Sequence, residues 1–416
     1  MIRPLRTELR RSAAPLASIA MFVAGAWTLA VHTDAWSGRW AGLAAHVRTS
    51  LVVLCGVMVA ASAWQAGRER RRGMAEMLGS TPRPPWQPLL VSWFAVSLGG
   101  VVGYLIAVGI AAVFVGPVAT YAGGDWPWVL AVGIEALWAA SAFGFLAGRV
   151  IPLRVVAPVA GLASYLAFFA FTPDQNSGAN WLSPAFFGWG NGRLLPEWTS
   201  LWQAGWLLAL TATLLAAAAR LRWTTAVSAM VAIAVAMGVA ASPGISDLPV
   251  DAAAAKLVCT ADGRICVARV NAFLLDDVVD VAGPLMNRMD GIPGAPARAI
   301  DALGHESAPR PADGDIVWLN LAFQATPSGG LVNTQWVLDD FRQMLWCATP
   351  GPLDQRRSEV ANLAWSWLVD KQEFADVPLD RLKALPIEAQ RSWFGEYLAA
   401  VGACDDDRLR QLGEER

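Results

Sequence analysis

Residues 89–115 read LLVSWFAVSLGGVVGYLIAVGIAAVFV, 27 consecutive positions without a charged side chain. A helix needs about 20 apolar residues to cross the hydrocarbon core of a bilayer, so this stretch predicts a membrane-spanning helix. It contains four glycines: Gly99, Gly100, Gly103 and Gly109. Because glycines let helix backbones approach closely, and a long span can tilt, we expect this helix to tilt, bend or pack closely against a neighbour.

Six other stretches are apolar over a similar length. With residues 89–115 they predict seven spans, at 14–32, 49–66, 128–148, 153–171, 202–219 and 224–241. Only 16% of the 416 residues are charged, whereas soluble proteins average about 25%. The shortfall lies in residues 1–243, while residues 245–416 have the composition of a soluble chain. The sequence therefore predicts a mainly α-helical membrane protein that ends in a soluble domain.

The arginines predict the orientation, because cytoplasmic loops carry an excess of Lys and Arg. With a cytoplasmic N-terminus, thirteen arginines face the cytoplasm: Arg3, Arg6, Arg10, Arg11, Arg68, Arg70, Arg71, Arg72, Arg83, Arg149, Arg154, Arg220 and Arg222. The short external loops then hold three: Arg39, Arg48 and Arg193. Seven spans place residues 245–416 on the extracytoplasmic side of a bacterial cell membrane. A cleaved signal peptide is the alternative for residues 1–32, but the long apolar run and the lack of a clear A-x-A site favour a retained span.

Four of the five cysteines lie in the predicted soluble domain: Cys259, Cys266, Cys347 and Cys404. An even number of cysteines outside the cytosol predicts disulfides, and four cysteines allow three pairings. The short segment between Cys259 and Cys266 has the residues of a turn, which favours a bond between these two. That pairing leaves Cys347 with Cys404.

The loop between the second and third predicted spans, residues 67–85, carries the most specific motif. Residues 68–82 read R-E-R-R-R-G-M-A-E-M-L-G-S-T-P. On a short helix, one face would hold three apolar side chains: Met74, Met77 and Leu78. Glu76 would project from another face, and Pro82 would end the helix. A short amphipathic helix of this kind suits docking to a partner. The alternative is a basic loop that only follows the arginine bias, but the motif spacing favours docking.

This motif resembles the coupling helix of type-2 ABC transporter permeases, in which an E-R-x-x-G-x-x-E-x-L-x-x-T-P stretch docks on the ATPase subunit. The matching residues here are Glu69, Arg70, Gly73, Glu76, Leu78, Thr81 and Pro82. The resemblance implies a six-span permease domain over residues 13–222, a connecting helix at the inner interface over 1–12, and short re-entrant helices in the loop 172–201. The chain departs from the family in a seventh span, 223–243, and an extracytoplasmic α+β domain, 244–416. Its Ala-, Gly- and Trp-rich, Lys-poor composition is similar to that of actinobacterial permeases with such tails.

The resemblance also implies partners. It implies a homodimer in the lipid bilayer and a separately encoded ABC ATPase that binds ATP and Mg²⁺. The only lysines are Lys256, Lys371 and Lys383, and none belongs to a phosphate-binding loop, so we expect no cofactor on this chain. The net charge of −2 argues against a nucleic-acid partner.

The expected function is therefore the permease subunit of an ATP-driven exporter of a peptide, a lipid-like molecule or an antibiotic, and not an enzyme. The alternative is a membrane-anchored extracytoplasmic sensor, or an immunity or assembly factor, without transport.

One acidic residue, Glu135, lies near the middle of the fourth predicted span. An ionisable group at this depth costs a few kcal/mol and usually faces a protein interior or a water-filled cavity. Two interpretations stay open. Glu135 lies on the translocation pathway, or it is protonated and hydrogen-bonded to a neighbouring span.

The soluble domain alternates between strand and helix patterns. We expect a hairpin at 256–268, a helix at 270–289, a strand at 315–323 and helices near 333–347, 354–372 and 386–401. His305 is its only histidine, which excludes a zinc site built on two histidines, and no G-x-S-x-G elbow is present. We therefore expect no catalytic residue and no metal site. We interpret the acidic runs at 276–280 and 405–407 as solvated faces, and the domain's tryptophans as core.

Overall fold

The computed structural model describes residues 7–10, 12–71, 84, 86–123, 126–151, 153–170, 177–185, 192–303, 315–322, 324–347, 355–374 and 379–414. The chain forms two compact units, Met1–Asp251 and Ala252–Arg416. The boundary lies slightly beyond the predicted one at residue 244. This shift occurs because the segment after the last apolar helix packs on the first unit, where Leu194 N donates to Pro249 O at 2.9 Å.

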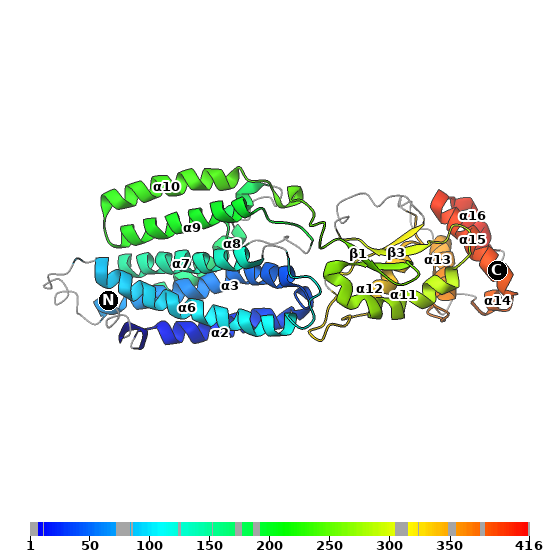
Figure 1. Ribbon diagram of the computed structural model, residues 1–416, viewed down its shortest axis with the longest axis horizontal. Helices are drawn as coiled ribbons and strands as arrows, with labels where there is room; N and C mark the ends of the chain where they lie inside the picture. Colours follow the sequence, from blue (N-terminus) through cyan, green and yellow to red (C-terminus); the bar gives the residue numbers. More distant parts are fainter. Residues whose placement is uncertain are drawn as a thin grey trace. The chain divides into compact units, whose positions relative to one another are not determined.

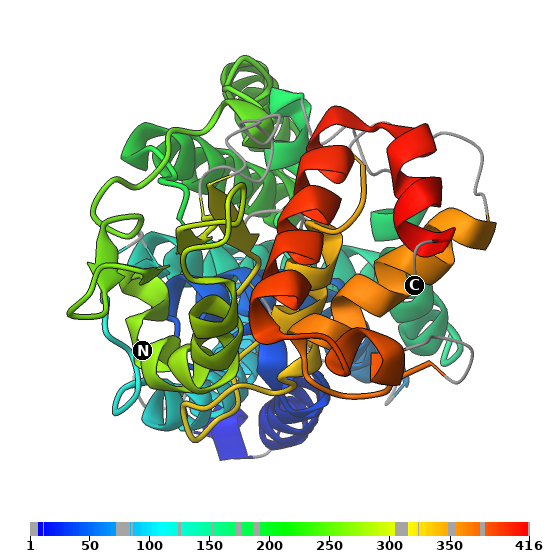
Figure 2. The same cartoon turned by 90° about the vertical axis from the view of Figure 1, so that its right-hand side faces the viewer.

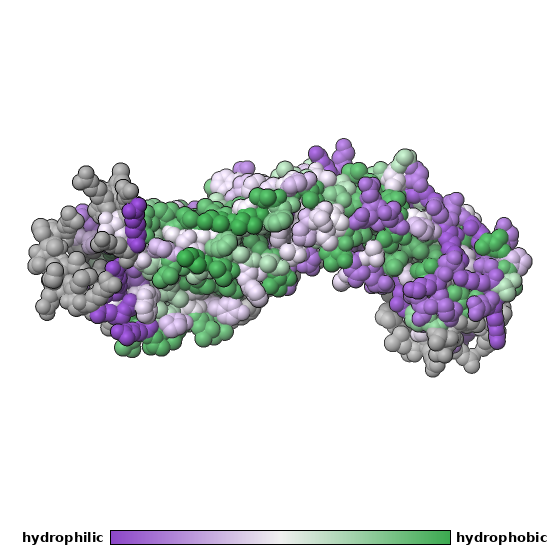
Figure 3. Space-filling model, turned by 90° about the horizontal axis from the view of Figure 1, so that it is seen from below, coloured by the Kyte–Doolittle hydropathy of each residue, from purple (hydrophilic) through white to green (hydrophobic). Residues whose placement is uncertain are grey.

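The first unit is a bundle of helices (Figure 1). Six of them are long and apolar enough to cross a membrane: α2 (Ala14–Val31), α3 (Trp40–Ala66), α6 (Trp86–Val115), α7 (Trp126–Val150), α9 (Glu197–Ala218) and α10 (Arg222–Ala240). Hydrophobic residues cover much of the visible surface of these helices, whereas hydrophilic residues cover much of the second unit (Figure 3). An apolar exterior of this kind fits a multi-pass membrane protein.

The predicted span at 153–171 differs from the other six. It corresponds to α8, Val156–Ala170, a helix of 15 residues. Such a helix is about 22 Å long, which is shorter than the roughly 30 Å hydrocarbon core. Its outward face is nevertheless apolar, since Leu162 is 59% exposed. Among the described residues, six of the seven predicted spans thus have the length of a span, and the seventh is represented by this shorter apolar helix.

The second predicted span begins nine positions earlier than expected, because α3 starts at Trp40 and not at residue 49. Arg48 therefore lies inside a helix and not in an external loop. The helix forms despite this charge because polar groups around it are satisfied: His46 Nε2 lies 3.0 Å from Thr28 O, and Arg48 has the partners described below.

Small residues allow the helices to pack backbone to backbone. In α7, a methyl group on Gly144 or Gly148 would overlap the carbonyl oxygen of Val59 or Ala63 in α3. In α6, a methyl on Gly99 would lie 2.5 Å from the carbonyl of Ala14 in α2. Close packing of this kind is the main source of helix association in lipid. Of the glycines in residues 89–115, Gly99 and Gly103 thus mark the expected close contact with a neighbouring helix, whereas Gly109 meets no atom within 4 Å.

Short elements complete the first unit. They are α4 (Arg68–Arg71), η1 (Thr33–Ala35), η2 (Gly178–Leu182) and η3 (Ile245–Asp247). Of the predicted connecting helix at 1–12, residues 7–10 are helical and residues 1–6 and 11 lie outside the described part.

The second unit is an α+β domain with a four-stranded sheet in the order β1-β2-β3-β4. The strands are β1 (Leu257–Cys259), β2 (Ile265–Ala268), β3 (Arg298–Asp301) and β4 (Ile316–Leu319). β1 pairs antiparallel with β2, as the predicted hairpin requires, whereas the β2–β3 and β3–β4 pairs are parallel. The sheet is therefore mixed.

The helices of this unit cover the sheet and pack on one another. They are η4 (Arg269–Leu274), α11 (Leu275–Met289), α12 (Gln335–Gln343), α13 (Gln355–Leu368), α14 (Leu379–Lys383), α15 (Ile387–Ala403) and α16 (Asp406–Glu414). α16 packs against both α13 and α15 (Figure 2). The core between them contains Trp365, Trp367 and Trp393, none more than 2% exposed, as the core interpretation predicts. Trp336, in contrast, is 56% exposed.

Candidate functional site

The segment 177–185 is the described part of the predicted loop 172–201, and it packs into the helical unit. Its 3₁₀ helix η2 begins after Ser177, whose Oγ accepts a hydrogen bond from Ala179 N at 3.2 Å. Trp181 is fully buried, and its indole N–H donates to Pro243 O at 2.8 Å. A side chain at Gly178 would overlap the backbone of Ser242. Trp181 is therefore a core residue of the first unit.

A buried arginine holds this segment from α3. Arg48 is 2% exposed, its Nε donates to Pro184 O at 3.1 Å, and its Nη2 donates to Gln203 Oε1 on α9. Its guanidinium carbon also lies 5.4 Å from the centroid of the Trp181 ring, within cation–π range. A charge inside a membrane-spanning helix is costly unless it is paired or hydrogen-bonded, and Arg48 is hydrogen-bonded through its Nε and Nη2 atoms.

Residues of α9 hold the adjoining carbonyls. Gln203 Nε2 donates to Trp181 O at 2.6 Å and to Ser183 O at 3.0 Å, while Trp206 Nε1 donates to Leu182 O at 3.1 Å. Four consecutive carbonyls, of residues 181–184, are thus hydrogen-bonded to side chains of α3 and α9. Backbone carbonyls next to an apolar surface need partners inside the protein, and these four have them. We call this arrangement the Arg48–Gln203 clamp.

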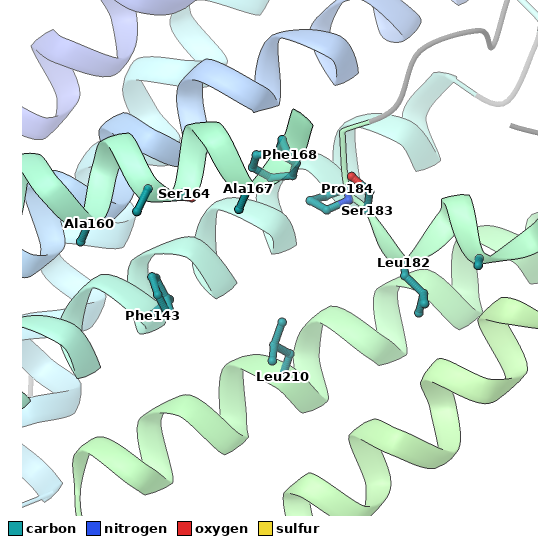
Figure 4. A pocket seen from close by; sticks show the side chains of 11 residues that line it. Phe143, Ala160, Ser164, Ala167, Phe168, Leu182, Ser183, Pro184 and Leu210 are labelled. Carbon is teal, nitrogen blue, oxygen red and sulfur yellow. The ribbon is translucent and has the colours of Figure 1, made fainter. Parts of the chain in front are cut away.

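An apolar groove lies beside the clamped loop. It has a volume of about 760 Å³ and lies between α8 and α9, with α7 beneath them. Its lining residues are Phe143, Ala160, Ala163, Ser164, Ala167, Phe168, Ala179, Leu182, Ser183, Pro184 and Leu210. Figure 4 shows α8 residues on one side of the space, Leu210 on the other and Leu182 to Pro184 at one end. The groove has the size of a small-molecule site, and its surface is almost entirely hydrocarbon.

Glu135 lies on α7, two helical turns before Phe143 of the groove. Its Oε2 atom is buried, and no described residue hydrogen-bonds to it. The hydrogen bond that one of the two interpretations requires is therefore not seen among the described residues. The pathway interpretation stays a prediction.

The other end of α3 leads into the predicted coupling loop. The helical hydrogen bonds continue past Ala66, since Gly67 N donates to Ala63 O at 3.2 Å and Arg71 N donates to Gly67 O at 3.1 Å. Glu69 and Arg70 lie in this extension, α4. The remaining predicted residues lie outside the described part: Gly73, Met74, Glu76, Met77, Leu78, Thr81 and Pro82.

Gln65 fastens three helices together at this end of α3. It is 5% exposed; its Oε1 accepts a hydrogen bond from Ala13 N before α2, and its Nε2 donates to Ser92 Oγ on α6 at 3.1 Å. A second buried polar contact lies nearby, where Ser141 Oγ of α7 lies 2.8 Å from the hydroxyls of both Ser62 and Ser97. Hydrogen bonds between spans add about 1 kcal/mol each in lipid, so these contacts tie α2, α3, α6 and α7 together.

The second unit contains one disulfide, Cys259–Cys266, across the antiparallel β1–β2 pair, as predicted. The second predicted bond is not formed. Cys347 and Cys404 are not joined by a disulfide, and Cys347 Sγ donates to Val401 O at 3.5 Å. Burial, together with a hydrogen bond to Cys404, raises the pKa of Cys347 to about 11.

The acidic runs of this unit have local structural roles. Asp405 Oδ1 accepts a hydrogen bond from Arg408 N, and Asp406 and Asp407 lie in the first turn of α16, where acidic residues stabilise a helix. In the run 276–280, Asp277 Oδ2 accepts Leu331 N at 2.7 Å. Within the described ranges, no cluster of three or more His, Cys, Asp or Glu side chains could hold a metal ion.

The sequence-based search missed Arg48, Gln203 and Gln65. Each is a long polar side chain inside an apolar run, which is the signal that drew attention to Glu135. Arg48 was missed because it was assigned to an external loop. Gln203 and Gln65 were missed because they carry no charge. Comparison with protein-family models, with curated proteins and with solved structures finds no match to this chain.

Proposed function

We propose that this chain is the permease subunit of an ATP-driven exporter of the type-2 ABC kind. The observation that carries the proposal is the construction of α3 at the end that leads into residues 67–85. There the helix continues through Gly67 to Arg71, and Gln65 binds it to α2 and α6. A partner that pushes on the coupling motif would therefore move several spans and not only a loop.

The packing of α3 on α7 supports the same mechanism. Gly148 of α7 lies against the Ala63 carbonyl, one turn from the end of α3, so the two backbones meet where the push would arrive. Interfaces this close do not deform gradually, and they transmit displacement as rigid elements. In this proposal a separate ATPase binds ATP and Mg²⁺, and its closure moves α3 and α7 together.

The proposed orientation follows the arginine bias, with the N-terminus and the coupling motif in the cytoplasm and residues 252–416 outside. The proposed assembly is a homodimer, since the resemblance implies a pathway between two permease chains. The substrate class is a peptide, a lipid-like molecule or an antibiotic.

The alternative, a membrane-anchored sensor or an immunity or assembly factor, needs no ATPase. Its support is that residues 252–416 fold around a core of their own, as a receptor domain would. Binding to an ATPase separates the two proposals.

The test co-expresses the full chain with the ABC-type ATPase from its genomic neighbourhood and purifies the complex in detergent. We expect a stable complex with ATPase activity, and we expect Glu76→Lys to reduce ATPase recovery at least tenfold. Arg149→Gln is the matched control, since it changes a charge at the same predicted membrane face but outside the motif. Unchanged recovery with Glu76→Lys would remove the docking assignment, and failure of any ATPase to bind would favour the sensor.

A further inference from the structure

The groove between α8 and α9 is open to the apolar exterior of the helical unit and is not used by the proposed coupling mechanism. Among the described residues that line it there is no ionisable side chain, and the polar side chains are the hydroxyls Ser164 and Ser183. Ser183 Oγ already donates to Ala185 O. A polar or charged ligand would lose its hydration in this groove without gaining partners. The apolar lining therefore favours a ligand whose bound part is a hydrocarbon.

The volume of the groove restricts the occupant further. The groove has a volume of about 760 Å³, which is within the 300–1,000 Å³ range of sites that enclose one small ligand. A flexible hydrocarbon chain meets both conditions.

The wall of the groove is built in advance. Leu182, Ser183 and Pro184 form one end of it, and all three of their carbonyls are hydrogen-bonded on the protein side by Trp206, Gln203 and Arg48. The backbone polarity of the wall is thereby removed from the groove. A site whose wall is fixed before binding loses little entropy when its ligand arrives.

We propose that the groove between α8 and α9 binds one acyl chain of a membrane phospholipid, with Leu182–Pro184 as its end wall. The inference does not depend on transport: a sensor with the same groove would bind the same lipid, so its failure and that of the permease proposal are distinguishable.

The experiment uses the full chain, delipidated in detergent and titrated with dioleoyl-phosphatidylcholine, with bound lipid counted by native mass spectrometry. We expect one tightly bound lipid per chain. Ala163→Trp fills the groove and should reduce the bound fraction at least fivefold. Leu162→Trp is the control, because it adds the same ring to the opposite, exposed face of α8.

Two further arms complete the test. Ala160→Leu adds less volume to the same wall and should also reduce lipid binding. This variant keeps the test valid if Ala163→Trp fails to fold. A phosphatidylcholine with a diazirine at its acyl terminus should cross-link to residues 160–168 or Leu210 in wild type and lose those products in Ala163→Trp. Equal lipid binding by wild type and both filled variants would overturn the proposal. So would a change of oligomeric state with unchanged lipid binding, which would assign the groove to a second copy.

Discussion

Arg48 of α3 and Gln203 of α9, 155 positions apart in the sequence, are hydrogen-bonded to each other with both side chains at most 2% exposed. The same two side chains hold the carbonyls of Trp181, Ser183 and Pro184. One pair therefore joins two spans and positions a loop.

Arg48→Ala should destabilise the protein strongly. The substitution leaves the Gln203 and Pro184 oxygens without their donor in a buried site, and hydrogen bonds to charged groups contribute about 1.5–3 kcal/mol each. We expect a loss of about 3 kcal/mol or more, measured as thermal stability by size-exclusion chromatography after heating. The exposed Arg154→Ala is the control. A double-mutant cycle with Gln203→Ala should be non-additive by more than 1 kcal/mol, and strict additivity would contradict the clamp.

Gly148→Ala should weaken the contact between α3 and α7. The added methyl would overlap the Ala63 carbonyl, and overpacking typically costs about 1–3 kcal/mol. Gly109→Ala in α6 is a matched control, because a methyl there meets no atom within 4 Å. It should be neutral or stabilise the helix by up to about 1 kcal/mol. Equal midpoints of thermal unfolding for the two variants would show that the α3–α7 contact is not close.

Glu135→Leu should raise thermal stability by about 1–3 kcal/mol. The buried Oε2 has no hydrogen-bond partner among the described residues, so an apolar side chain of similar size removes the cost of burying that oxygen. Glu135→Gln keeps a polar atom and serves as the comparison. If Glu135→Leu is instead less stable than Glu135→Gln, the carboxyl group has a partner that stabilises the fold.

Alkylation of Cys347 should remain slow at neutral pH. The thiolate is the reactive form, and burial raises the pKa of this thiol from 9.0 to about 11. The thiolate fraction should therefore rise about tenfold per pH unit up to about pH 10 and level off near 11. The raised pKa also means that the neutral thiol stabilises the fold below about pH 9, and that this contribution disappears as the pH rises through 11. Iodoacetamide labelling followed by peptide mapping measures the rate, and a plateau near pH 9 would contradict the burial.

Asp301→Ala should unfold the second unit more readily. Asp301 is 4% exposed; its Oδ2 accepts hydrogen bonds from Ala268 N and Asn271 Nδ2, and its Oδ1 accepts Leu303 N at 3.1 Å. Removing it leaves buried donors without an acceptor, which costs about 2–4 kcal/mol in total. The exposed Asp280→Ala should change stability by less than about 0.5 kcal/mol. Protease resistance of residues 252–416 in the full chain measures both.

Much of the helical unit follows from hydropathy alone, because long apolar runs have few alternatives to spanning helices. The errors have physical causes. α3 begins early at Trp40, and His46 and Arg48 in its first half form hydrogen bonds with residues distant in the sequence, which no local window can show.

In the second unit, the hairpin at Cys259–Cys266 is visible in the sequence because alternation and a turn coincide there. β3 was missed, since its four residues, Arg298–Asp301, are too few to show a pattern and are ordered by parallel neighbours on both sides. Counting cysteines pairs Cys347 with Cys404, but in the structure a hydrogen bond and not a disulfide links these two thiols.

The absence of side chains at Gly144 and Gly148 also limits how this molecule can change shape. Two helices in direct backbone contact cannot slide or rotate against each other without steric overlap, so α3 and α7 are expected to move as one rigid body. A conformational change of the helical unit therefore has to occur at other helix interfaces, where neighbouring helices pack less closely. The interface between α8 and α9 is one of these, so an acyl chain bound there would prevent α8 and α9 from moving closer together.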